Sequence, residues 1–160
     1  MPWFEDLDID LYRDLGSHCF TEAEIIRFAR KFDPQYFHID PVLAAAGPFG
    51  GLIASGWHSL ATWMKLMVAA MQREAVTAAA SGSRSPASGP SPGFLDLTWP
   101  HPVRPGDTIR YSTTLIEKVT LKSRPDWGLV RGRNEGVNQR GELVLRFTGQ
   151  GLVKRKTRAQ

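Results

Sequence analysis

The segment 57–74 constrains the fold of this chain more than any other segment does. It is rich in alanine, leucine and methionine and contains no glycine or proline, which predicts a long α-helix. Apolar residues occupy almost every side of this helix rather than a single stripe. A helix of that kind is buried, so the rest of the chain is expected to wrap around it.

The second half of the chain has the pattern of a β-sheet. Four segments alternate apolar and polar residues and are rich in β-branched residues, which predicts strands. These segments are 94–103, 107–122, 127–138 and 142–153. Turn signals separate them at Pro105-Gly106, Pro125-Asp126 and Arg140-Gly141. A strand at 16–20 would extend this sheet, and helices followed by long antiparallel strands indicate an α+β fold.

Two short helices are predicted before the long one. Thr21 and Glu24 have the spacing of a capping box, and apolar residues then recur at helical spacing. This helix is expected to end near Asp33, because a residue that precedes proline avoids the helical conformation. A second short helix is expected to begin at Asp40-Pro41 and to stop at Gly47-Pro48.

The length of 160 residues fits a single domain over residues 1–160. Residues 78–93 consist mainly of alanine, serine, glycine and proline without an apolar period, which predicts a flexible insertion. Residues 154–160 contain four basic and no acidic side chains and are expected to form a solvated tail.

The net charge of +4 is weak evidence for a nucleic-acid-binding protein. The tail carries the whole excess, because residues 1–153 have as many acidic as basic side chains. Residues 1–40 are acidic and residues 101–160 are basic, and a basic segment also suits a small polyphosphate ligand. No nucleic-acid partner is therefore expected.

The chain has the features of a cytoplasmic protein. Cys19 is the only cysteine, so no intrachain disulfide can form and a reducing compartment is expected. The N-terminal segment lacks the basic and apolar regions of a signal peptide. His58 and Lys65 interrupt the longest apolar stretch, so no membrane span is expected.

Asp33 and His38 are the first candidates for chemistry. They lie five residues apart where the chain leaves a predicted helix, so a carboxylate and an imidazole can converge on one water molecule. General acid–base catalysis requires such a pair. The alternative is purely structural: a solvated aspartate at the end of a helix and a histidine that caps it.

The glycine-rich segment 51–56 is the second candidate, because it leads directly into the long helix. The first N–H groups of a helix have no internal partner and favour negative charge, so the Gly56 N–H could stabilise an oxyanion. The alternative is that glycine allows close packing against the strands. Ser55 is a poor nucleophile candidate, because Ile53 stands where a nucleophile elbow has glycine. No metal site is expected, since the histidines are scattered and His38 and Asp40 lack a third ligand.

Taken in order, these motifs resemble those of the MaoC-like (R)-specific enoyl-CoA hydratases. Asp33 and His38 match the acid–base pair of that family, and Gly56 follows His38 at the family's spacing of 18 positions. Phe49 and the residues 53–56 match the segment that opens the central helix, and residues 102–108 match the start of a sheet strand. The sequence departs from the family at Gln35, Tyr36, Ser55 and Met64.

The resemblance implies a hot-dog fold, in which an antiparallel sheet wraps around a long central helix, and a homodimer or a higher oligomer. It implies reversible hydration of trans-2-enoyl-CoA thioesters, with Asp33 as base, His38 holding the water and the Gly56 N–H as oxyanion donor. Coenzyme A would enter only as part of the substrate, and no separate cofactor is implied. The expected substrate-binding residues are Phe49, Ser55, Trp57, Arg104, Lys122 and Arg124, the last three for the phosphates of coenzyme A.

Two other functions fit the same resemblance. A hot-dog thioesterase would hydrolyse the thioester, although the buried helix has no carboxylate before Glu74. A non-catalytic subunit would bind acyl-CoA or a partner chain without turnover, and the changes at Gln35 and Met64 leave this alternative open.

Overall fold

The computed structural model describes residues 2–82 and 89–156. Within these ranges it contains one short 3-10 helix, four α-helices and five strands. In chain order they are η1 (Phe4–Asp6), β1 (Tyr12–Cys19), α1 (Glu22–Phe32), α2 (Tyr36–Ile39), α3 (Pro41–Ala45), α4 (Gly56–Ala80), β2 (Phe94–Thr98), β3 (Thr108–Thr120), β4 (Trp127–Val137) and β5 (Leu143–Lys154). The α+β order expected from the sequence is confirmed.

The strands form one antiparallel sheet in the order β1-β3-β4-β5-β2. The long strands β3, β4 and β5 lie at the centre, and β1 and β2 form the two edges. Across the centre, Thr113 pairs with Asn134 and Asn134 pairs with Phe147, so the three residues form a row on one face. The indole of Trp63 on α4 meets the Phe147 ring edge-to-face at 4.7 Å, which identifies this face as the one that α4 covers.

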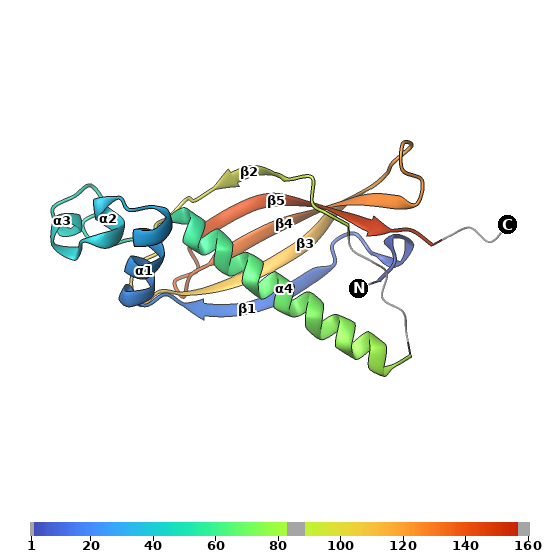
Figure 1. Cartoon of the computed structure of the whole chain (residues 1–160), viewed down its shortest axis with the longest axis horizontal. Helices are drawn as coiled ribbons and strands as arrows, with labels where there is room; N and C mark the ends of the chain where they lie inside the picture. The colour runs from blue at the N-terminus through green and yellow to red at the C-terminus, as the bar shows by residue number, and fades with distance from the viewer. Residues whose placement is uncertain (1, 83–88, 157–160) are drawn as a thin grey trace.

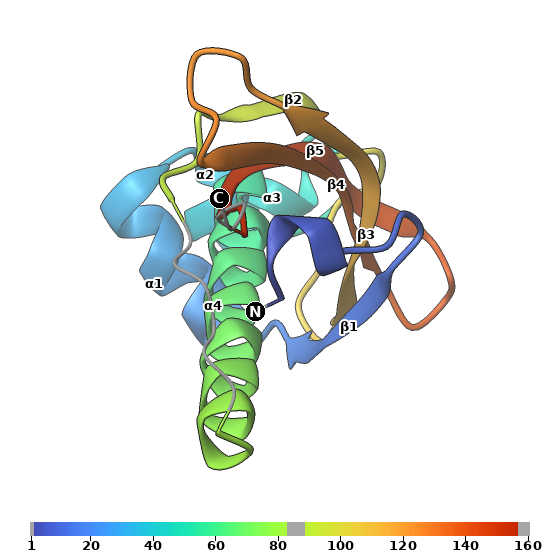
Figure 2. The same cartoon turned by 90° about the vertical axis from the view of Figure 1, so that its right-hand side faces the viewer.

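The sheet curves over α4, and the C-terminal part of this helix extends away from it (Figures 1 and 2). The buried residues of α4 are His58, Ser59, Thr62, Trp63 and Ala70. The expectation that the whole helix is buried is wrong, because Trp57, Met64, Val68 and Val76 are exposed. The sheet of one chain covers one side of the helix and leaves the apolar opposite side in contact with solvent.

Several element boundaries differ from the predicted ones. The long helix runs from Gly56 to Ala80, six residues beyond Glu74, because alanine sustains a helix and Gly82, at φ +71°, is the first residue that breaks it. The predicted start of the insertion at residue 78 is therefore too early, because residues 78–80 are still part of the helix. Residues 83–88 of the predicted insertion lie outside the described residues. β2 ends at Thr98 instead of residue 103, because Pro100 and Pro102 have no N–H to pair.

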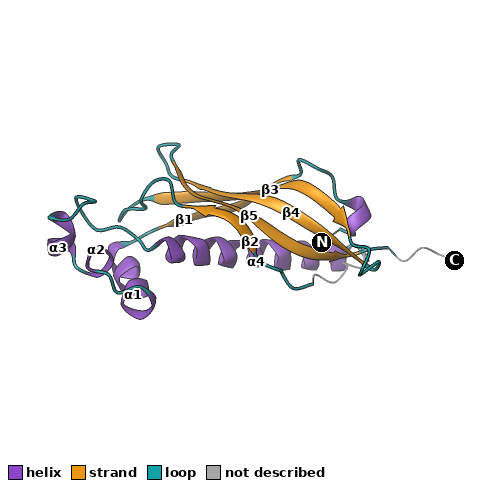
Figure 3. Cartoon of the chain, turned by 90° about the horizontal axis from the view of Figure 1, so that it is seen from above, coloured by secondary structure: helices purple, strands orange, loops and turns teal. Residues whose placement is uncertain are grey.

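The three short helices lie beyond one end of the sheet, next to the start of α4 (Figure 3). The Thr21 hydroxyl accepts a hydrogen bond from the Glu24 N–H at 3.3 Å, which confirms the predicted cap of α1. Asp40 caps α3 through the N–H groups of Val42 and Leu43. The four-residue helix α2 was not predicted, since four residues are too few to show a helical period.

The two ends of the described chain are tied together. Arg155 pairs with Glu5 at 2.8 Å and Lys156 pairs with Asp6, so the first residues of the expected solvated tail are held in place. Residues 157–160 of that tail lie outside the described residues. No helix within the described ranges is long and apolar enough to cross a membrane.

Candidate active site

Asp33 stands at the junction between α1 and the segment that carries α2. It is the C-cap of α1, and its N–H donates to the Ala29 carbonyl at 2.8 Å. Its two carboxylate oxygens accept different hydrogen bonds: Oδ1 accepts from Gln35 Nε2 at 2.8 Å, and Oδ2 accepts from Ser55 Oγ at 2.7 Å. The side chain is 19% exposed, so the carboxylate is held in place and still open to a small molecule.

His38 lies on α2 and faces Asp33. Its Nδ1 is 2.8 Å from the Ile53 carbonyl oxygen, and because a carbonyl can only accept, Nδ1 carries the proton. Neutral His38 therefore presents an unprotonated Nε2, which lies 3.4 Å from Asp33 Oδ2. The loop that supplies this carbonyl is fixed in turn, since the Ile53 N–H donates to Phe37 and the Ala54 N–H donates to Val103.

The surroundings of Asp33 favour its ionised form. Burial raises the pKa of this carboxyl, but the hydrogen bonds from Gln35 and Ser55 and the positive charge that His38 carries when protonated lower it by more. The pKa of Asp33 therefore lies below the ordinary aspartate value. The arrangement places a charged carboxylate oxygen beside an imidazole lone pair, which is a geometry for binding and deprotonating water.

The start of α4 adjoins this pair through Ser55. The Ser55 hydroxyl donates to Asp33 and accepts from the Trp57 N–H at 3.3 Å, so one side chain caps α4 and holds the carboxylate. Gly56 is the first residue of the helix, and its N–H has no partner within the helix. A Cβ on Gly56 would lie 2.5 Å from Cε2 of Trp99, so glycine is required for the indole to pack here.

The structure brings some of the expected substrate-binding residues close to the pair. Phe49 is half-exposed, contacts Phe37 edge-to-face at 5.2 Å, and its carbonyl accepts from Arg104 Nη2 at 2.7 Å. Trp57 is exposed and packs edge-to-face on Trp99 at 5.5 Å. The expectation for Ser55 needs correction, because its side chain is buried and its hydroxyl already serves Asp33 and the helix N-terminus.

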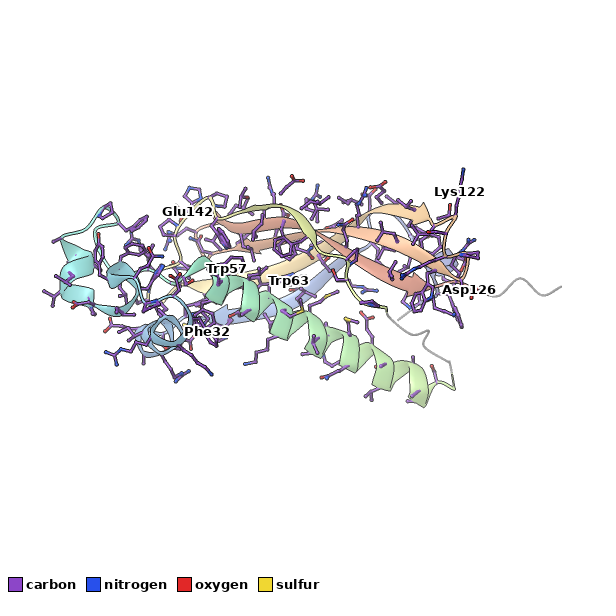
Figure 4. All side chains as sticks on the ribbon, turned by 45° about the horizontal axis from the view of Figure 1, so that its top comes forward. Phe32, Trp57, Trp63, Lys122, Asp126 and Glu142 are labelled. Atoms are coloured by element: carbon purple, nitrogen blue, oxygen red, sulfur yellow. The ribbon has the colours of Figure 1, made fainter. Side chains whose placement is uncertain are left out.

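Lys122 and Arg124 are not part of this cluster. Both belong to the connection between β3 and β4, and Lys122 lies at the end of the molecule opposite Phe32 (Figure 4). Within one chain Lys122 therefore lies far from the end that carries Phe32. Among the described residues, no group of three or more His, Cys, Asp or Glu side chains could hold a metal ion.

Sequence reasoning missed three contributors to the site. Gln35 appeared only as a departure from a family pattern, although a side-chain amide two residues after Asp33 is well placed to bond its carboxylate. The Ile53 carbonyl and the Trp99 indole gave no signal, because both reach the site through tertiary contacts. A cavity of about 270 Å³ between α4 and the sheet was also not foreseen.

A family model described as a MaoC like domain matches residues 13–127 of this sequence, which is well over half of its length. The chain belongs to the MaoC-like domain family. A MaoC-like dehydratase from Rhodospirillum rubrum has a similar solved structure, with 37% sequence identity and a TM-score of 0.80 over 98% of this chain and 99% of that chain. A Mycobacterium tuberculosis protein with a double hotdog fold aligns at a TM-score of 0.73 over 99% of this chain and 46% of that chain, at 17% identity. The fold is thus the hot-dog fold expected from the sequence.

Curated relatives include a hydratase and a dehydratase, and each matches only part of the chain. The 3-hydroxyacyl-thioester dehydratase Z of Mycobacterium tuberculosis is 32% identical over 97 residues, which cover 60% of this chain and 58% of that protein. The mesaconyl-CoA hydratase of Cereibacter sphaeroides is 36% identical over 67 residues, which cover 42% of this chain and 19% of that protein. The chain thus spans less than two thirds of the length of these relatives.

Proposed function

We propose that this protein catalyses the reversible hydration of trans-2-enoyl-CoA thioesters to (R)-3-hydroxyacyl-CoA. The single observation that carries the proposal is the pairing of Asp33 and His38, whose Oδ2 and Nε2 lie 3.4 Å apart beside the start of α4. Membership of the MaoC-like family, with hydratases and dehydratases among the relatives, supports the same reaction type.

In the proposed reaction a water molecule binds between Asp33 and His38. One of its O–H groups donates to His38 Nε2, which is free to accept because Nδ1 carries the proton. Asp33 Oδ2 takes the other proton as the water oxygen attacks C3 of the enoyl group. The same proton is then delivered to C2, so the elements of water add across the double bond and no other reactant is needed. General acid–base help of this kind contributes about 10²–10⁴-fold to a rate.

The thioester oxygen gains negative charge as the water attacks. In our proposal the Gly56 N–H, at the positive end of the α4 dipole, donates to this oxygen. A preorganised donor of this kind is worth about 3–4 kcal/mol of transition-state stabilisation. Trp99 packs against Gly56 and would restrict the approach of the acyl group at this point.

The remainder of the substrate would occupy two regions. The cavity of about 270 Å³ between α4 and the sheet has a mainly apolar lining and would take the acyl chain. Arg104, which adjoins the loop before α4, is placed to meet a phosphate of coenzyme A. Lys122 and Arg124 would contribute only where a second subunit places its own connection between β3 and β4 next to the site.

A hot-dog thioesterase remains the second candidate function. It would use the same fold and ligand, but within the described residues α4 carries no carboxylate before Glu74, so no acidic side chain lies on the helix near Gly56. A non-catalytic acyl-CoA-binding subunit is the third alternative. The retention of both Asp33 and His38 in contact argues for turnover.

One pair of assays on the wild-type protein separates these functions. Crotonyl-CoA is followed by loss of the enoyl thioester absorbance, and free thiol is measured in parallel with DTNB. Hydration without thiol release is the expected result. Thiol release at the rate of substrate loss would identify a thioesterase, and binding of crotonyl-CoA without either change would identify a non-catalytic subunit.

A further inference from the structure

The cavity between α4 and the sheet has a distinct polar position inside a mainly apolar lining. Along α4 the cavity extends from Trp63 to Met71. Trp63 follows Gly56 by seven residues and hence by about 10 Å along the helix axis. Met64 and Met67 form its helix wall, and Phe147 lies on the sheet side. The near end of the cavity therefore lies about two helical turns beyond Gly56.

Glycine residues form part of the floor of this cavity. Gly132, Gly149 and Gly151 line it from β4 and β5. A Cβ on Gly149 would lie 2.8 Å from Asn134 Nδ2, and a Cβ on Gly132 would lie 3.1 Å from Thr113 Oγ1. The absence of side chains at Gly149 and Gly132 therefore lets Asn134 and Thr113 pack closely over the strand backbone at the cavity floor.

Thr113 and Asn134 are buried but incompletely bonded. They are 9% and 2% exposed, and they form a cross-strand pair, so their Cβ atoms are about 5 Å apart. Asn134 Nδ2 donates to the Gly132 carbonyl at 2.9 Å, which leaves Oδ1 as an acceptor. Within residues 2–82 and 89–156, neither Asn134 Oδ1 nor Thr113 Oγ1 takes part in a side-chain hydrogen bond. Both residues line the cavity, so Asn134 Oδ1 and Thr113 Oγ1 have capacity for one more polar group from a ligand.

The chemistry of the pair selects the kind of group that fits. Asn134 Oδ1 can only accept, whereas the Thr113 hydroxyl can donate or accept. A ligand hydroxyl satisfies both, because it donates to Asn134 and accepts from Thr113. A carboxylate would be repelled by Asn134 Oδ1, and Arg13, the cationic residue of the lining, already pairs with Glu74 at 3.5 Å.

We propose that this cavity binds an acyl group that carries a hydroxyl, and that Thr113 and Asn134 recognise that hydroxyl. The proposal rests on the proposed function, since it assigns a substrate class to the same site. An apolar cavity of about 150 Å³ holds benzene, so 270 Å³ has room for roughly ten non-hydrogen atoms. A medium-length acyl chain with a hydroxyl near its far end fits this space.

Binding of saturated ligands tests the proposal without any turnover. Dissociation constants are measured by calorimetry for decanoyl-CoA and for decanoyl-CoA that bears a hydroxyl on one of its last three carbons. The wild-type protein is expected to bind the best hydroxylated ligand about tenfold more tightly than the plain one. The substitution Thr113→Val should weaken this preference because one of the two hydrogen bonds is lost, and Thr113→Ser should retain it.

Thr114→Val is the matched control, because Thr114 follows Thr113 on β3 and its side chain points to the opposite face of the sheet. It should keep the wild-type preference. Equal affinity of the wild-type protein for both ligands would overturn the proposal, and so would a preference that Thr113→Val leaves unchanged. Crotonyl-CoA is too short to reach Thr113, so its hydration reports on the proposed function alone.

Discussion

At the residue scale, the ionisation of Asp33 depends on two neutral neighbours. Gln35 and Ser55 each donate to one oxygen of the carboxylate, and together with His38 they lower its pKa against the effect of burial. An aspartate with a lowered pKa remains charged at lower pH than usual. Activity that requires the carboxylate is therefore retained above this lowered pKa and is lost as the pH falls through it.

Removal of one donor should move this acid limit. Ser55→Ala deletes the hydrogen bond to Asp33 Oδ2 and should raise the pKa of Asp33, so the acid limb of the kcat/KM profile moves to higher pH. Ser59→Ala is the control, because the Ser59 hydroxyl is equally buried but donates to the Gly56 carbonyl. An acid limb that stays in place in Ser55→Ala would show that Asp33 does not control it.

His58 is a second residue whose ionisation matters, and it acts on stability. It is buried, stacks on Phe28 at 4.4 Å and meets Phe20 edge-to-face at 4.9 Å, and its Nδ1 has no partner among the described residues. Burial lowers the pKa of His58 to about 4, although the nearby Glu24 opposes this; His18 and Arg27 lower it further. Below the ordinary histidine pKa the unfolded chain binds a proton that the folded chain excludes, so acid favours unfolding down to about pH 4.

His58→Phe should remove this part of the acid sensitivity. The free energy of unfolding is measured in urea at pH 7 and at pH 4.5. Its decrease between these two pH values should be smaller in the variant than in the wild type, by on the order of 2 kcal/mol. The exposed His101 gives the control His101→Gln, which should behave as the wild type does. An identical loss of stability in His58→Phe and the wild type would contradict this account.

At the element scale, the start of α4 meets the end of β2. Trp99 follows β2 and packs its indole on Gly56 and against Trp57. This contact explains why residue 56 is a glycine, which a role in oxyanion stabilisation would also explain. Sequence reasoning left the two explanations open because a contact between residues 56 and 99 leaves no local pattern, whereas caps such as Thr21 and Asp40 lie within three residues of their partners and were visible.

A double-mutant cycle separates the two roles of Gly56. Gly56→Ala places a methyl group 2.5 Å from the Trp99 ring and should lower the free energy of unfolding by about 1–3 kcal/mol. In a Trp99→Ala background the same substitution should cost almost nothing, since the clash is gone. An equal cost in both backgrounds would show that the Trp99 contact does not explain the glycine.

The same scale shows why the central helix was only partly understood from sequence. Its existence was clear from composition, and its hydrophobicity on all sides suggested complete burial. In the structure the exposed side carries Trp57, Met64 and Val68, spaced one or two turns apart. Trp57 contacts the exposed Trp99, and Phe94 is exposed on the edge strand β2. One helix side and one open sheet edge thus both expose apolar residues, which suits pairing with a second copy of the chain.

At the scale of the whole molecule, charge that is segregated in the sequence is mixed in space. Arg110 pairs with Asp14, and Arg155 and Lys156 pair with Glu5 and Asp6, so basic residues of the last third neutralise acidic residues of the first forty. The sequence therefore overstated the separation between an acidic and a basic half. Antiparallel pairing of β1 with β3 and the return of β5 beside η1 bring these opposite charges together.

The proposed homodimer predicts a change of mass. Met64→Glu places a charge in the exposed apolar surface of α4 and should convert a dimer into a monomer in analytical ultracentrifugation. Lys65→Glu is the control, since Lys65 is the adjacent residue of the helix and already charged. A wild-type protein that sediments as a monomer would contradict the dimer.

The most direct test of the account is the turnover number for crotonyl-CoA hydration in Asp33→Asn. Asparagine keeps the size of the side chain but cannot take a proton from water, so kcat should fall by about 10²–10⁴-fold, and His38→Gln should also lose most activity. Asp14→Asn is the control, because Asp14 is exposed on β1 and pairs with Arg110 away from His38. The account predicts wild-type turnover for Asp14→Asn and near-complete loss for Asp33→Asn. A folded Asp33→Asn variant that hydrates crotonyl-CoA within twofold of the wild-type rate would contradict it.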